Sequence, residues 1–166
     1  MWTSSRAAVI WLLFTALLQA PTEASAQMEA FGDPARLRGV TPVAVRALVD
    51  WDQLITETAG GATEEQFHQA VVQTFEATLE DKGVEIDPSS ERFLMCRVET
   101  IYNSGLISFA ARVELHEPFG APGQSAITWH RTWIGSAPVQ GMHLLFQIGE
   151  QCAEDFADAW TAANTG

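Results

Sequence analysis

The sequence predicts an α+β fold, a two-layer sandwich in which two helices pack on one face of a mainly antiparallel four-stranded sheet. The expected order is β-α-β-β-β-α. Three segments between residues 92 and 135 alternate apolar and polar side chains, which is typical of half-buried strands. Residues 63–82 and the C-terminal segment instead repeat apolar residues at helical spacing. Since the 166 residues contain no internal repeat, we expect a single domain over residues 40–166.

Residues 1–26 have the pattern of a secretory signal peptide. Arg6 precedes the uncharged apolar residues 7–20, and Ala24-Ser25-Ala26 is the small-x-small pattern at which signal peptidase cuts. The apolar run is shorter than the ~20 residues that span a bilayer. We therefore expect cleavage after Ala26, export to the periplasm or the extracellular space, and no stable membrane anchor afterwards. An uncleaved anchor is the alternative.

The chain is strongly acidic, with 21 Asp and Glu against 9 Lys and Arg and a net charge of −12. A surface of this sign repels phosphates, so nucleic acid and anionic lipid headgroups are excluded as partners. Adaptation to a salty habitat and ordinary acidity of an exported protein both explain the composition.

The N-terminal half of the predicted domain contains one strand and one helix. Residues 27–39 are polar and aperiodic, so we expect a flexible segment there. Residues 43–51 alternate as a strand whose position in the sheet stays open. Residues 63–82 form an amphipathic helix, because Thr63 and Gln66 make a capping box and Gly83 is a natural stop. The apolar stripe of this helix comprises Phe67, Val71, Phe75 and Leu79.

The C-terminal half continues with three strands and a helix. Residues 92–102 and 106–117 alternate on either side of Asn103-Ser104-Gly105, a tight hairpin turn. Residues 125–135 form the next strand, and Pro138 suits the first turn of a last helix. The apolar stripe of this helix comprises Leu145, Ile148, Cys152, Phe156, Ala159 and Trp160.

The two cysteines are predicted to form a disulfide. Cys96 lies on the apolar face of its strand and Cys152 on the apolar stripe of the last helix, so both face the seam between helix and sheet. Export brings them into an oxidising compartment, where a bond is the default state. Two buried free thiols are the alternative.

The sheet face away from the helices is the candidate binding face. Arg97, Arg112 and Glu114 should lie on it, because each alternates with apolar neighbours. The strand at residues 125–135 can take two phases. In one, Trp129, Arg131 and Trp133 extend this face with groups that interfaces enrich. In the other, which we favour because large aromatic residues are usually buried, both indoles enter the core.

Histidines and carboxylates offer the only candidates for catalysis or metal binding. His116 and Glu117 stand near a strand end, and His130 lies on the neighbouring strand, so they are weak candidates for acid–base roles or zinc ligation. The sequence has no His-Glu-x-x-His, no Gly-x-Ser-x-Gly and no P-loop motif. We therefore predict no catalytic residue, no metal site and no cofactor.

The sequence as a whole indicates an exported, non-catalytic binding or accessory protein of the bacterial cell envelope or secretome. Its partner would be an unidentified protein or small molecule, or a second copy that forms a homodimer through the open sheet. A small secreted hydrolase or metal-dependent enzyme that uses His116, Glu117 or His130 is the alternative. The missing catalytic motifs favour the first interpretation.

Overall fold

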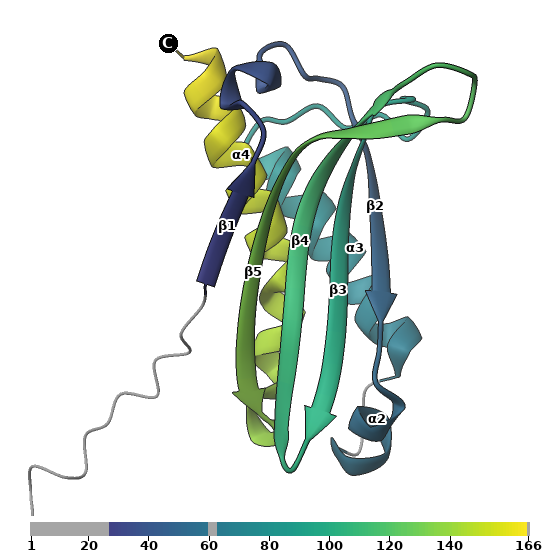
Figure 1. Cartoon of the computed structure of the whole chain (residues 1–166), viewed down its shortest axis with the longest axis vertical. Helices are drawn as coiled ribbons and strands as arrows, with labels where there is room; N and C mark the ends of the chain where they lie inside the picture. The colour runs from purple at the N-terminus through teal and green to yellow at the C-terminus, as the bar shows by residue number, and fades with distance from the viewer. Residues whose placement is uncertain (1–26, 60–62, 166) are drawn as a thin grey trace, which may run out of the picture.

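A computed structural model describes residues 27–59 and 63–165 of the chain. The predicted signal peptide and the Gly60-Gly61 break lie outside these residues. The described chain is an α+β protein built on a five-stranded sheet in the order β1-β5-β4-β3-β2 (Figure 1). The strands are β1 (Gln27–Phe31), β2 (Ala44–Asp50), β3 (Phe93–Asn103), β4 (Leu106–Pro118) and β5 (Ser125–Pro138).

Two long helices cover one face of this sheet. Helices α3 (Glu64–Asp81) and α4 (Ile148–Asn164) run side by side behind the strands, as Figure 1 shows. A short helix, α2 (Gln53–Ala59), follows β2, and two 3-10 helices, η1 (Pro34–Leu37) and η2 (Val139–Gln147), complete the described elements. Among residues 27–59 and 63–165, no helix is long and apolar enough to cross a membrane.

The predicted α+β architecture with helices on one face is confirmed, and the sheet has one strand more than expected. Residues 27–39, expected as a loose segment, contain β1 and η1. Strand β1 pairs antiparallel with β5, with Met28 opposite Trp133 and Phe31 opposite His130. This short strand forms by pairing with the edge of β5.

The end of β5 also differs from the prediction. Pro138 ends β5 and precedes η2, so the last α-helix begins ten residues later, at Ile148. The position of the first predicted strand, which the sequence left open, is the sheet edge. There β2 pairs parallel with β3, with Ala47 opposite Cys96.

Helix α3 has the predicted cap and stripe. The backbone N–H of Gln66 donates to Thr63 Oγ1 at 3.2 Å, and the N–H of Thr63 donates to Gln66 Oε1 at 3.0 Å. All four predicted stripe residues are fully buried: Phe67, Val71, Phe75 and Leu79. This packing orients α3 and leaves the opposite sheet face uncovered.

The predicted disulfide between Cys96 and Cys152 is confirmed. It joins strand β3 to α4, and both residues are fully buried. Helix α4 also meets α3 closely at Gly149, where an added Cβ would collide with Thr74 Oγ1 and the Val71 carbonyl. These contacts hold α4 against the sheet and define the sheet face that remains for function.

Candidate functional site

The candidate site is the open face, which we define as the sheet face turned away from α3 and α4. Along each strand, side chains alternate between the helix-covered core and this face. Eight large apolar side chains are exposed in the described chain, and six of them lie on the open face. These are Phe31, Leu48, Ile101, Leu106, Ile127 and Ile134, which are 42–66% exposed.

A buried carboxylate lies at the centre of the open face. Glu114 is only 1% exposed. Its Oε1 accepts from Nη1 of Arg112 at 3.3 Å and lies 3.9 Å from Nε of Arg97. Arg112 in turn donates from Nε to Thr132 Oγ1 at 2.9 Å. Two guanidinium groups therefore lie beside this carboxylate.

His116 lies between this carboxylate and the end of the strand. Nε2 of His116 is 2.9 Å from Glu114 Oε2, and Nδ1 is 3.3 Å from Ser125 Oγ. The imidazole stacks on Phe93, with ring centroids 4.4 Å apart and planes 13° apart. The guanidinium of Arg46 lies 3.8 Å from the centroid of the same Phe93 ring. Aromatic and hydrogen-bonding contacts thus hold the imidazole in one orientation.

A β-bulge brings Ser125 to the same face as His116. Leu115 is opposite Trp129, whereas His116 is opposite Ile127, so Thr128 is an extra residue in β5. Because side chains alternate with period two, one extra residue moves the following positions to the other face of the strand. Without this bulge, Ser125 would point away from His116.

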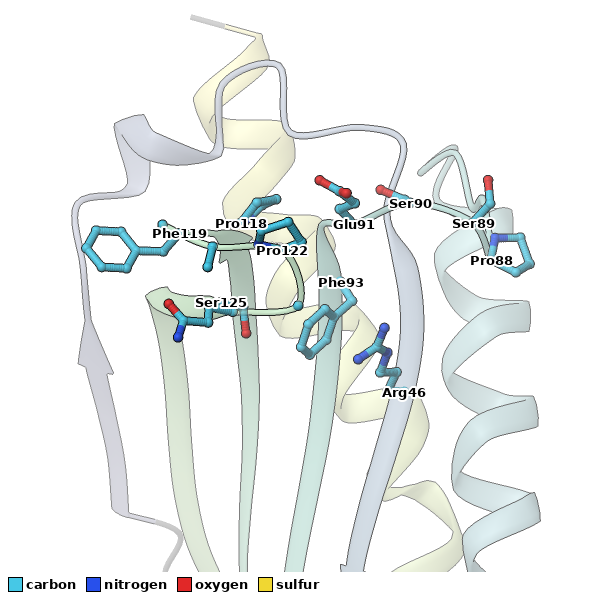
Figure 2. Close-up of a pocket in the computed structure, with 14 residues that line it drawn as sticks. Arg46, Pro88, Ser89, Ser90, Glu91, Phe93, Pro118, Phe119, Pro122 and Ser125 are labelled. Atoms are coloured by element: carbon cyan, nitrogen blue, oxygen red, sulfur yellow. The ribbon is translucent and has the colours of Figure 1, made fainter.

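A pocket of about 580 Å³ adjoins this cluster. It lies between the loop at residues 88–91 and the β4–β5 loop, with Phe93 and Arg46 below (Figure 2). Ser125 lines it. Figure 2 also shows the Phe119 ring and the Glu91 carboxylate directed away from Phe93 and Arg46. The lining mixes apolar residues such as Pro118, Ala121 and Pro122 with polar and charged ones, and the polar groups make up most of its surface.

The structure separates the residues that the sequence assigned to a binding face. Arg97, Arg112 and Glu114 lie together on the open face, as expected. Trp129 and Trp133 do not lie there, because Ala111 is opposite Trp133 in the register and both indoles are buried on the helix side. This is the phase that aromatic burial favoured.

Arg131 also points to the helix side, where its Nη1 lies 3.5 Å from Asp155 Oδ1 on α4. Asp155 is 6% exposed. Burial raises the pKa of this carboxyl above its ordinary value, and the positive charge of Arg131 opposes the change in pKa. Arg131 therefore belongs to the seam between α4 and the sheet, away from the open face.

The three candidates for acid–base or metal chemistry are also divided. Glu117 projects to the face opposite that of His116 and lies 3.3 Å from Nε of Arg92. His130 is opposite Glu114 in the register and stacks on Phe31, with centroids 5.1 Å apart. Within residues 27–59 and 63–165, no three His, Cys, Asp or Glu side chains are grouped as metal ligands.

Sequence reasoning missed Ser125, because it belongs to no nucleophile motif and reaches His116 only across the β4–β5 hairpin. Arg46 and Phe93 were missed for a similar reason, since they come together only through the parallel pairing of β2 with β3. The alternation that put Glu114 and His116 on one face was the available signal.

No family model matches the sequence, and no curated protein matches it. Among solved structures, the chain is similar to a point variant of the PelC dodecamer from Paraburkholderia phytofirmans, with a TM-score of 0.50 and 17% identity over 80% of this chain and 96% of that one. A second PelC dodecamer structure from the same organism gives a TM-score of 0.48 and 15% identity, over 84% and 97%. At such low identity, the likeness shows a shared fold.

Proposed function

We propose that this protein is an exported accessory protein of the bacterial cell envelope and that it acts by assembling with copies of itself through the open face. The observation that carries this proposal is the concentration of exposed apolar side chains there, six of the eight in the described chain. Exposed apolar side chains gathered on one face of a folded domain indicate an interaction site.

The charges on the open face fit a second copy of the same chain. Arg46, Arg97 and Arg112 share this face with Asp50 and Glu99. Two such faces related by a two-fold axis can set the arginines of one copy against the carboxylates of the other, as an isologous interface requires. One solved structure with a similar fold is a dodecamer of PelC, which supports assembly of this fold from identical subunits.

Two features support export. The first 26 residues have the pattern of a cleavable leader, and the domain carries a disulfide between Cys96 and Cys152. Disulfides persist in the periplasm and outside the cell, and are rare in the cytosol.

The test is native mass spectrometry of the full chain expressed with its leader and purified from a bacterial periplasm. We expect a mature chain that begins at Gln27, is two hydrogens lighter than the reduced mass, and forms an oligomer. Ile101→Glu places a charge on the most exposed apolar residue of the open face, and should shift the protein to monomer. Ala77→Glu makes the same charge change on the exposed side of α3 and should leave the oligomer intact.

Two outcomes contradict the proposal. A mature chain that is monomeric at every concentration argues against self-assembly, and an oligomer that Ile101→Glu leaves unchanged argues against the open face. A different protein or small molecule bound to the monomer would replace the second copy as the partner.

A further inference from the structure

We propose that Ser125, His116 and Glu114 form a nucleophile, a base and a positioning carboxylate that hydrolyse small carboxylic esters in the pocket beside them. This activity goes beyond the assembly role, and its nucleophile lines the pocket beside the β4–β5 loop. The side chains lie in series, with 3.3 Å from Ser125 Oγ to His116 Nδ1 and 2.9 Å from His116 Nε2 to Glu114 Oε2.

The proton positions follow from the chemistry of the partners. An ionised carboxylate only accepts hydrogen bonds, so Nε2 of His116 carries the proton that it donates to Glu114. In the neutral imidazole Nδ1 is then the unprotonated nitrogen, and in this form it accepts from the Ser125 hydroxyl. A serine paired with a base that a third group orients is the arrangement that activates a hydroxyl for attack. Relative to the familiar serine triad, the two ring nitrogens exchange roles.

Glu114 and Ser125, at the two ends of this series, differ in their exposure to solvent. Glu114 is 1% exposed and ion-paired to Arg112 and Arg97, whereas Ser125 is exposed. Phe93 covers one side of the imidazole. The positioning group is therefore shielded, while the nucleophile faces solvent and substrate.

The β-bulge at Thr128 supplies independent support. It is the only register shift recorded between β4 and β5 in the described chain, and it turns Ser125 onto the face of His116. Bulges are enriched beside active sites, where they redirect a side chain. Here the bulge is the reason that the hydroxyl and the imidazole meet.

The pocket indicates the class of substrate. A volume of about 580 Å³ is within the range of small-molecule sites, and a lining that mixes proline, alanine and phenylalanine with polar groups suits a small polar ester with a short acyl group. Arg46 lines the same pocket, and a positive charge in such a site favours the negative charge that develops on the carbonyl oxygen.

The reaction needs only ester and water. Ser125 Oγ attacks the carbonyl carbon while its proton passes to His116 Nδ1. The carbon–oxygen bond to the alcohol then breaks, and the alcohol leaves with that proton. Water, deprotonated by the same nitrogen, attacks the acyl-Ser125 ester, which releases the carboxylic acid and restores the serine.

The experiment measures hydrolysis of 4-nitrophenyl acetate and butyrate by the full chain purified from the periplasm. We expect Ser125→Ala to lower kcat about 100-fold or more, the usual scale of such catalysis. Thr161→Ala is the control, because it removes an exposed hydroxyl on α4, away from the open face. It should keep the parent rate.

Glu114→Gln tests the positioning role. It should lower kcat with little change in KM, whereas a mere packing defect would also lower the melting temperature. A fluorophosphonate probe should add its mass to the peptide that contains Ser125 in the parent protein. A parent rate within twofold of the Ser125→Ala rate would overturn the proposal, as would a probe that leaves Ser125 unmodified.

Discussion

Removal of the disulfide should strongly destabilise the domain. The bond between Cys96 and Cys152 spans 56 positions of sequence, so the closed loop is long. In the chain-entropy model, a loop of this length stabilises the fold by about 4 kcal/mol at 25 °C. For a domain of this size, the Cys96→Ala/Cys152→Ala double variant should melt about 10–15 °C below the parent.

The assay is urea unfolding of three samples: the oxidised parent, the reduced parent and the double variant. The reduced parent keeps both sulfur atoms, so it separates loss of the cross-link from the small cavities that alanine leaves in the buried seam. We expect both uncross-linked samples to lose several kcal/mol and to show a larger m value, because their unfolded chains expose more surface. Free energies of unfolding that agree within about 1 kcal/mol across the three samples would refute the reasoning.

Two further predictions concern α4. Gly149→Ala should destabilise the protein by about 1–3 kcal/mol, because the new Cβ collides with Thr74 and the Val71 carbonyl. This cost exceeds the gain from alanine's higher helix propensity. A variant that is more stable than the parent in urea would contradict this prediction. Asp155→Asn should flatten the pH dependence of stability. Burial raises the pKa of Asp155 in the folded state above its value in the unfolded state. The protonated carboxyl therefore stabilises the folded state in acid, and this stabilisation is lost as the pH rises above about 4. In thermal melts from pH 4 to 7, the melting temperature of the variant should increase relative to that of the parent as the pH rises. A constant difference in melting temperature would show that Asp155 does not cause the pH dependence.

Local chemistry explains what the sequence predicted correctly. Thr63 and Gln66 cap α3 because their side chains reach backbone groups only three residues away. The strict alternation of residues 106–117 predicts β4 and puts Glu114 and His116 on one face. The cysteine pairing was predictable as well, since both residues stand on apolar stripes that face each other across the seam.

The sequence by itself therefore determined the strands β2 to β5 and the helix α3 in their order, the presence of a C-terminal helix, the covered and uncovered sides of β3 and β4, and the disulfide. Tertiary structure decided where β1 and β2 pair, which face carries Trp129 and Trp133, and how Ser125 meets His116. Each of these depends on register between strands, and a shift of one residue exchanges the two faces of a strand. Such a shift leaves the composition and spacing of every segment unchanged, so only the packed sheet, with its bulge at Thr128, could place the candidate site.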